Sequence, residues 1–330
     1  MQTTTTFIAL LSLLSFTATA QQSPTQAPQS ASANDFIEVF KKLSGEHPGV
    51  RKGHAKGVCA LGSFEPSATA QARFDTPLFS DQAPITLRFS MGGGNPNANE
   101  AANAPRGMAV MFDLNNNRQH KIAGLTTPMF AGKNPEQFLG LLRINYAIAQ
   151  GEATKEDRQA YLEANPEAAH QGEWLQSHQP AAEYTSANYF GIHTFYTTLT
   201  NGELQAFRWT LVPKAGETLL TEQEQKNLPK SFLAKRLSER LKDGPVEYEW
   251  HWQLAKEGDP INDPSQVWPK DRETINVGTL KITESGGESC TPINFDPNQV
   301  TDGISTSQDP VLQIRSPAYA ISYGKRLQGQ

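Results

Sequence analysis

The chain has 330 residues, enough for one large domain or two ordinary ones, and 29 Lys and Arg against 34 Asp and Glu give a net charge of −5. This charge argues against a nucleic-acid partner. The 25 Gly and 22 Pro indicate many turns and argue against a long-helix or coiled-coil protein, and the only long apolar run, at the N-terminus, excludes a polytopic membrane protein.

The first 33 residues predict an export signal followed by a linker. An apolar run from Phe7 to Phe16 precedes the small residues Ala18-Thr19-Ala20, so we expect residues 1–20 to be a cleaved secretory signal. A short membrane anchor is the alternative, because no Lys or Arg precedes the run. Residues 21–33 mix Gln, Ser, Pro, Ala and Thr without periodicity, which is typical of a disordered linker. We therefore expect a folded domain over 34–330 in an exported, periplasmic protein.

The first part of the domain predicts a short helix and then strands. Asn34 or Asp35 can cap a helix that ends at Gly45, with apolar residues at i, i+3, i+4 and i+7: Phe36, Val39, Phe40 and Leu43. Strands are expected at 55–64, 85–90 and 108–112. In the second strand Arg88 and Ser90 share one face, and the apolar residues Ile85, Leu87 and Phe89 share the other.

The rest of the chain predicts helices around a hairpin. Asn201-Gly202 lies between the runs 195–200 and 203–212, which predicts a hairpin with a type I′ turn, and 246–253 is expected beside it. Helices are expected at 134–150, 155–164, 229–243 and 314–326. The order of elements favours an α+β domain on an antiparallel sheet, without an internal repeat.

Two clusters carry candidate chemistry. Arg315, Tyr319 and Arg326 fall along one face of the expected C-terminal helix. From spacing alone, this is a docking helix with a packed tyrosine and solvated arginines. His54 follows Arg51 and precedes a run of small residues, and by itself it would be a hydrogen-bonded structural histidine.

Together with other blocks, these clusters resemble the haem catalase family, in the same order along the chain from Arg51 to Arg326. The blocks are Arg51-x-x-His54-Ala55-Lys56-Gly57, Arg88-Phe89-Ser90, Pro105-Arg106-Gly107-Met108-Ala109-Val110, Thr127-Pro128-Met129-Phe130 with Asn134-Pro135 and Phe138, Gly191-Ile192-His193-Thr194-Phe195, Val267-Trp268-Pro269, Val277-Gly278-x-Leu280, Phe295-Asp296-Pro297, Asp309-Pro310 and Arg315-x-x-x-Tyr319. Because the chain is much shorter than the usual catalase, it resembles the minimal catalase-related peroxidase subgroup. The resemblance implies an eight-stranded antiparallel β-barrel with surrounding helices and one haem b buried between the barrel and the C-terminal helix.

The resemblance also implies residue roles. Tyr319 is expected to be the axial ligand of the haem iron, with Arg315 stabilising its phenolate. His54 is expected to be the distal acid and base, oriented by Ser90. Arg51, Arg88 and Arg326 are expected at the haem propionates, Phe138 against the haem face or simply in the core, and His193 and Asp309 behind Arg315.

One position departs from the family. A distal asparagine usually precedes the Thr-Pro-x-Phe block, whereas this chain reads Gly124-Leu125-Thr126. Leu125 in that place removes an amide that positions peroxide, although Thr126 could substitute in part. We therefore expect weak catalase activity and a larger share of peroxidase turnover.

The expected function is a haem peroxidase that uses hydrogen peroxide to oxidise a small organic electron donor. The alternatives are a true catalase, a haem enzyme that transforms organic hydroperoxides, and a haem-binding or storage protein. A monomer or small homo-oligomer is expected, because the arm and wrapping segments of the interlocked catalase tetramer are missing. The two cysteines, Cys59 and Cys290, are permitted to form a disulfide in an exported chain, but the sequence does not establish their proximity.

Overall fold

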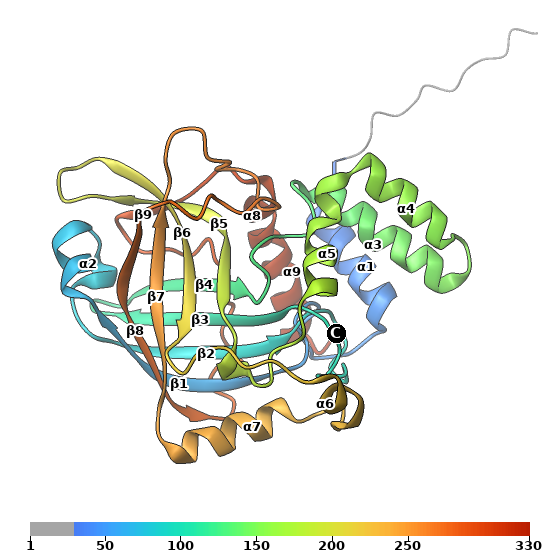
Figure 1. Ribbon diagram of the computed structural model, residues 1–330, viewed down its shortest axis with the longest axis horizontal. Coiled ribbons are helices and arrows are strands. Elements are labelled where there is room, and N and C mark those ends of the chain that lie inside the picture. The colour runs from blue at the N-terminus through green and yellow to red at the C-terminus, as the bar shows by residue number, and fades with distance from the viewer. Residues whose placement is uncertain (1–29) are drawn as a thin grey trace, which may run out of the picture. The chain divides into compact units, whose positions relative to one another are not determined.

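Eight antiparallel strands close into a barrel in the computed structural model, which describes residues 30–330 (Figure 1). The strands follow the order β4-β3-β2-β1-β8-β7-β6-β5, and a pairing between β4 and β5 at Leu125 and Phe190 closes the ring. The short β9 pairs with β5 beside the closure. The strands are β1 Gly57–Pro66, β2 Ala83–Met91, β3 Arg106–Leu114, β4 Arg118–Leu125, β5 Tyr189–Thr198, β6 Leu204–Pro213, β7 Val246–Leu254, β8 Thr274–Ser285 and β9 Ile304–Thr306.

Large aromatic side chains fill the barrel interior. Phe112 stacks on Trp250 at 5.2 Å between ring centroids, and Trp250 in turn meets Trp252 edge-on at 5.8 Å. Their burial follows from strand alternation, because every second residue of β7 is buried. Ile85, Leu87 and Phe89 of β2 are also buried in this core. The predicted division of that strand into two faces is confirmed, and it leaves the Arg88 face on the outside of the barrel.

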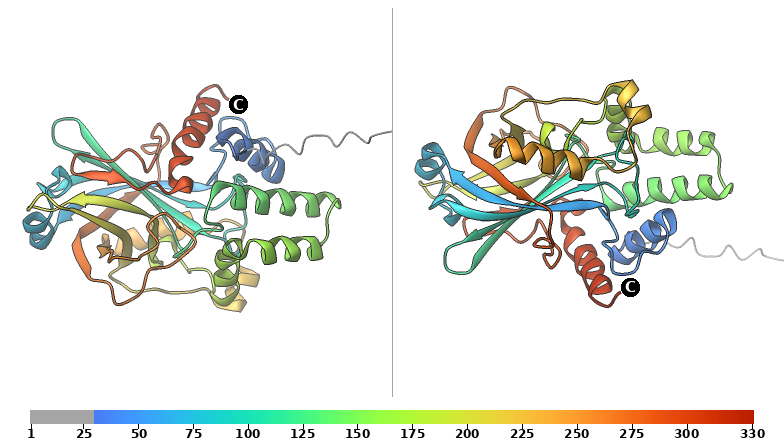
Figure 2. Two further views of the ribbon diagram at one scale, coloured as in Figure 1. Left: turned by 90° about the horizontal axis from the view of Figure 1, so that it is seen from above. Right: turned by 90° about the horizontal axis from the view of Figure 1, so that it is seen from below.

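Helices cover the outer surface. Figures 1 and 2 show α7 lying along one side of the barrel, while α1, α3, α4, α5 and α9 gather at one end. The helices are α1 Ala33–Ser44, α2 Ala68–Arg73, α3 Pro135–Gln150, α4 Lys155–Ala164, α5 His170–Ser177, α6 Glu222–Asn227, α7 Leu233–Arg240, α8 Pro310–Gln313 and α9 Arg315–Leu327. Short 3₁₀ turns occur at Pro77–Phe79, Pro166–Ala168, Tyr184–Ser186 and Leu241–Asp243. Within the described residues, none of the helices has the length and apolar content needed to cross a membrane.

Several predicted boundaries are corrected. The predicted signal sequence, 1–20, and most of the predicted linker, 21–33, lie outside the described residues. The cap of α1 is Ser32, not Asn34 or Asp35, and it forms a capping box with Asp35. The helix predicted from residue 229 begins at Leu233, because the buried carboxylate of Glu100 accepts from the backbone N–H groups of Phe232 and Leu233.

The hairpin turn is also corrected. A type I′ turn needs positive φ at both central residues, but only Gly202 of the predicted Asn201-Gly202 pair has one, at 86°. The N–H of Gly202 instead donates to the carbonyl of Leu199, which lengthens the loop. Two consecutive positive φ values occur at Asn116 (62°) and Asn117 (57°), in the β3–β4 connection.

The fold shows that the two cysteines of the chain form a disulfide. Cys59 on β1 and Cys290, which lies after β8, form a disulfide with their Cα atoms 5.3 Å apart. The two residues are 231 positions apart in the sequence, and the antiparallel pairing of β1 with β8 brings them together.

Candidate active site

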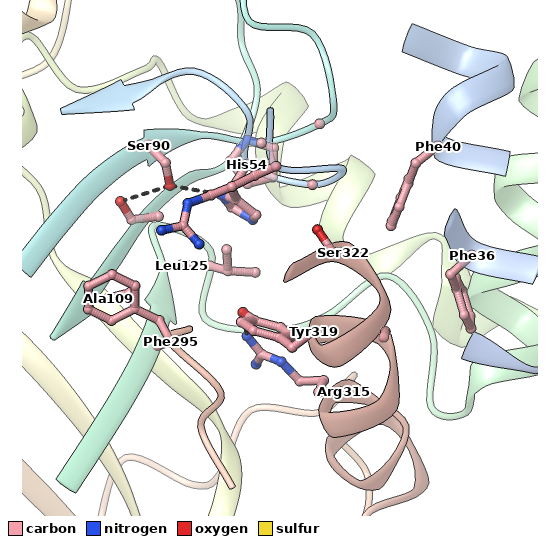
Figure 3. Close-up of a pocket in the computed structure, with 18 of the residues that line it drawn as sticks. Phe36, Phe40, His54, Ser90, Ala109, Leu125, Phe295, Arg315, Tyr319 and Ser322 are labelled. Atoms are coloured by element: carbon pink, nitrogen blue, oxygen red, sulfur yellow. Dashed lines mark hydrogen bonds between the residues drawn. The ribbon is translucent and has the colours of Figure 1, made fainter. Parts of the chain in front are cut away.

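A cavity of about 350 Å³ lies between the outer face of β2, β3 and β4 and helices α1, α3 and α9. It contains nearly all of the residues that the sequence singles out, with the exception of Asp309. Those that line it are Arg51, His54, Arg88, Ser90, Phe138, His193, Arg315, Tyr319 and Arg326. Figure 3 shows His54 and Ser90 on one side of the cavity and Arg315 and Tyr319 on the other.

His54 sits in a loop that two backbone contacts hold in an unusual conformation. Its φ is 52°, in the left-handed region that residues other than glycine rarely adopt. The Arg88 guanidinium donates to the carbonyls of His54 at 2.8 Å and Ala55 at 2.9 Å. These bonds explain how the loop keeps that conformation and aims the imidazole into the cavity.

The hydrogen bonds of Ser90 determine which imidazole nitrogen carries the proton. Ser90 Oγ lies 2.9 Å from Nδ1 of His54 and donates its own proton toward the Gly107 carbonyl at 3.5 Å. Ser90 therefore accepts from Nδ1–H, which leaves the lone pair on Nε2. Gly107 permits this packing, because a Cβ there would lie 2.8 Å from Ser90 Oγ and 2.9 Å from the His54 ring.

Burial, together with the smaller effect of the positive charges of Arg88, Arg315 and Arg51, lowers the pKa of His54 from 6.5 to about 4. The imidazole is therefore neutral at pH 7. A neutral imidazole with a free Nε2 can take a proton from a molecule in the cavity, as a general base must.

Across the cavity, Tyr319 and Arg315 lie one turn apart on α9. Nη2 of Arg315 donates to Oη of Tyr319 at 2.8 Å. A guanidinium bonded to a phenol oxygen stabilises the phenolate, so this pair can present an anionic oxygen ligand to a metal.

His193 and Asp309 form a buried pair beside this helix. Nδ1 of His193 donates to Oδ2 of Asp309 at 2.6 Å, and the other carboxylate oxygen caps α8 through the N–H groups of Val311 and Leu312. His193 lines the cavity but Asp309, which is 0% exposed, does not. Among the described residues, neither is hydrogen-bonded to Arg315, so the expected extension of hydrogen bonds behind that arginine is not present.

The cavity concentrates positive charge. Among residues 30–330, Arg51, Arg88, Arg315 and Arg326 form no ion pair with a carboxylate, and no Asp or Glu lines the cavity. Burial and the neighbouring arginines lower the pKa of Arg51 to about 9, and burial above all lowers that of Arg88 to about 10. Nη2 of Arg326 is buried without a hydrogen-bond partner in the described part of the chain. A group with carboxylates would relieve this unbalanced charge.

The remaining lining is apolar. Phe138 lines the cavity and also packs against Phe36 of α1 at 5.7 Å between ring centroids, so it belongs to the core, while its contact with a haem face stays a prediction. Leu125 lines the cavity between His54 and Tyr319 (Figure 3). Thr126 does not line it, and its Oγ1 accepts from the backbone N–H of Arg106 at 3.0 Å. The expectation that Thr126 substitutes for the missing amide is therefore not supported.

Two lining residues were missed by the sequence analysis. Phe295 was part of a resemblance block but received no role, and its ring lies 5.8 Å from the Arg51 guanidinium. Gln171 belongs to α5, a helix that was not predicted, and its Nε2 donates to Thr127 Oγ1 at 2.9 Å and to the Met129 carbonyl at 3.0 Å. No pattern in the sequence points to Gln171.

Comparisons with known proteins agree with one another in matching this chain to catalases and catalase-related peroxidases. The model of the Catalase family matches residues 14–330. The chain is 38% identical over 301 residues to a catalase-related peroxidase of Synechococcus elongatus, covering 90% of this chain and 89% of that protein. It is 33% identical over 294 residues to a catalase-related peroxidase of Mycolicibacterium paratuberculosis, covering 87% of this chain and 92% of that protein. The structure of catalase A from Saccharomyces cerevisiae superposes with a TM-score of 0.73 at 21% identity, covering 86% of this chain and only 62% of that one.

Proposed function

The chain belongs to the catalase family, and we propose that it is a haem-dependent peroxidase that uses hydrogen peroxide to oxidise small organic electron donors, with weak catalase activity. One observation carries the proposal. A neutral histidine with a free Nε2 faces an arginine-supported tyrosine across a cavity with four arginines and no carboxylate.

The residues of the cavity fit a haem. Its flat apolar ring suits the lining of Phe138, Leu125 and the small residues of β3 and β4, and its two carboxylates suit Arg51, Arg88 and Arg326. Tyr319 would hold the iron through its phenolate oxygen. The cofactor is proposed to be haem b, because the only two cysteines of the chain are joined to each other and leave none for covalent attachment.

Bound haem supplies the iron centre that receives the oxidising equivalents of peroxide. The chain's own part is proton transfer and exclusion of water. Nε2 of His54 would take a proton from one peroxide oxygen and return it to the other oxygen, which would depart as water, so that the O–O bond would break heterolytically. Ser90 holds the ring in the tautomer that this transfer needs, and Arg315 donates a hydrogen bond to the Tyr319 oxygen that would bind the iron. The organic donor would supply the electrons that complete the turnover.

The test compares wild type with His54→Ala after both are loaded with haem. Peroxide is expected to change the visible spectrum of the wild type within milliseconds to seconds, and the variant is expected to react at least about a hundredfold more slowly while it retains haem. Stopped-flow absorbance measures both rates. Equal rates would contradict the role of His54. A rapid reaction with organic hydroperoxides but none with hydrogen peroxide would favour the hydroperoxide-transforming alternative, and haem binding without any reaction would favour the storage alternative.

Export and assembly stay predictions. Cleavage after residue 20 and a periplasmic location are supported by the Cys59–Cys290 disulfide, because disulfides persist in oxidising compartments. Amino-terminal sequencing of the protein from a periplasmic extract would check them, and a mature chain that starts at Met1 would contradict them.

The oligomeric state is predicted to be a monomer or a small homo-oligomer. Light scattering would check this state, and a tetramer of the interlocked type would contradict it.

A further inference from the structure

The segment between β8 and β9 forms one wall of the cavity without regular secondary structure. Residues 286–303 contain no helix or strand, yet Asn294 and Phe295 line the cavity. We call residues 287–295, the part of this connection that contains Cys290, Asn294 and Phe295, the wall segment. Cys290, near its middle, is only 1% exposed and is joined to β1 by the disulfide. Its backbone N–H also points at Sγ of Cys59, at 3.2 Å. The disulfide thus fixes the wall segment to the barrel.

The same wall segment holds Arg51. Nη2 of Arg51 donates to the carbonyls of Cys290 and Ile293, both at 3.0 Å. The two carbonyls belong to one turn, closed by the N–H of Ile293 donating to the Cys290 carbonyl at 3.2 Å. Because one nitrogen makes both bonds, Nε and Nη1 have no protein partner in residues 30–330 and stay available to a group in the cavity.

Arg51 depends on this turn because it has no other anchor. Among the described residues it forms no ion pair, and its other contact, with the Phe295 ring at 5.8 Å, is also made to the wall segment. The neighbouring arginines repel it, since Arg88 and Arg326 both act to lower its pKa. An arginine under such repulsion turns away unless its hydrogen-bond acceptors are held in place.

We propose that the Cys59–Cys290 disulfide is a positioning device for Arg51: it holds the carbonyls of Cys290 and Ile293 so that the free edge of the guanidinium faces a carboxylate of the bound group. This rests on the proposed haem site. The disulfide does not touch the group itself, so its effect on binding passes through Arg51. Without it, the wall segment loses its covalent link to β1, the two carbonyls move, and the guanidinium no longer holds the carboxylate in a fixed geometry.

The experiment measures the rate of haem release, by transfer from the loaded protein to excess apomyoglobin, followed in the visible spectrum. Four proteins are compared with wild type: Cys59→Ala/Cys290→Ala, Arg51→Ala, the triple variant, and Leu237→Ala as a control. Leu237 is fully buried on α7, away from the cavity lining, so its truncation lowers stability without touching the wall segment.

The double cysteine variant and Arg51→Ala are each expected to release haem about tenfold faster or more, and the triple variant no faster than Arg51→Ala alone. Leu237→Ala is expected to lower the thermal midpoint and leave the release rate unchanged. A release rate of the double variant equal to wild type, or a triple variant whose rate multiplies the two separate effects, would overturn the proposal. An unchanged rate in Arg51→Ala would overturn it as well, because the carboxylate contact would then be absent.

Two further controls keep the result clear. If the double cysteine variant does not fold, wild type treated with a phosphine reductant replaces it, after thiol titration confirms two free cysteines per chain. The reduced protein is expected to release haem faster than the untreated protein. An unchanged release rate overturns the proposal. Haem carrying methyl esters in place of its carboxylates is expected to leave at the same rate with and without the disulfide, and a persistent difference would mean that the disulfide acts other than through Arg51. Failure of the wild type to bind haem at all contradicts the proposed function, and is thereby distinguished from failure of this inference.

Discussion

At the scale of single residues, Leu125 determines the polarity of the cavity beside His54. Its side chain lies between His54 and Tyr319 (Figure 3), and the nearest hydroxyl along the chain, that of Thr126, is bonded to the Arg106 backbone. The hydrogen-bonding group beside Leu125 that we expect peroxide to meet is therefore the His54 imidazole. Catalase turnover requires a second peroxide molecule. We expect this turnover to be slow, because one hydrogen-bonding group orients that molecule less well than two groups would.

Leu125→Asn is expected to restore the second group. The new amide can donate to peroxide. A well-positioned donor of this kind raises kcat about a hundredfold in other enzymes, so we expect a less precisely placed amide to raise the rate of oxygen release about tenfold. Oxygen-electrode measurements on the haem-loaded protein check this. Leu125→Met, which keeps an apolar side chain of similar volume, is the matched control and is expected to leave oxygen release unchanged. An equal gain in both variants would contradict the argument.

The pH dependence of the reaction follows from the same histidine. Because the pKa of His54 is lowered from 6.5 to about 4, the neutral base is present throughout the range above pH 4 and is lost only as the pH falls through that value. We expect kcat/KM for peroxide to stay level from pH 7 to pH 5 and to fall below pH 4. A decline centred on pH 6.5 in the pH profile would show that the imidazole is not desolvated.

The same shift affects stability. In the unfolded chain a histidine titrates near 6.5, so between pH 6.5 and 4 the unfolded state binds more protons at His54 than the folded state does. The contribution of this residue to stability is therefore greatest above pH 6.5 and decreases as the pH falls toward 4. His120, whose burial inside the barrel lowers its pKa to about 3, acts in the same direction.

At the scale of elements, β3 supports the site through a residue without a side chain. Gly107 pairs with Ser90 across the β2–β3 ladder, and its missing Cβ leaves room for the His54 ring. Gly107→Ala is expected to push Ser90 and His54 aside and to slow the reaction with peroxide about tenfold or more, while haem binding is retained, because Tyr319 and the arginines on α9 are untouched. Stopped-flow absorbance and haem titration measure the two properties.

The control for this prediction is Gly172→Ala. Gly172 lies on α5, close to the cavity-lining Gln171, but a Cβ at Gly172 meets nothing within 4 Å. It is expected to change neither property. Loss of haem binding in Gly107→Ala, or an unchanged rate with peroxide, would show that the packing at Gly107 does not position His54.

Elements with strong periodicity were predictable, and those defined by tertiary contacts were not. The faces of β2 and the strand β7 follow from the spacing of apolar residues, and the C-terminal helix was expected from the spacing of Arg315, Tyr319 and Arg326. The start of α7 is set by the carboxylate of Glu100, which lies 132 residues from Phe232. At Asn201-Gly202 the N–H of Gly202 bonds to the Leu199 carbonyl in a longer loop, whereas two consecutive positive φ values occur at Asn116-Asn117, so the Asn-Gly pair alone did not predict the turn type.

At the scale of the whole molecule, closure of the barrel assembles the site from distant parts of the chain. His54 and Tyr319 are separated by most of the sequence, and only the ordered blocks of the family resemblance indicated that they share one cavity. The roles of Arg88 in holding the His54 loop and of Gln171 in the lining were not predictable, because both depend on how separate elements pack. The disulfide could not be predicted either, because its two cysteines are 231 residues apart and meet only through the pairing of β1 with β8.

The central proposal is that this cavity makes the chain a haem peroxidase and only a weak catalase. The most direct measurement reconstitutes the purified protein with haem, adds hydrogen peroxide together with an organic donor, and records oxygen release and donor oxidation in the same sample. The account predicts one haem per chain, a spectrum typical of tyrosine-ligated ferric iron, and donor oxidation in excess of oxygen release. Vigorous oxygen release with little donor oxidation, or failure to bind haem stoichiometrically, would contradict it.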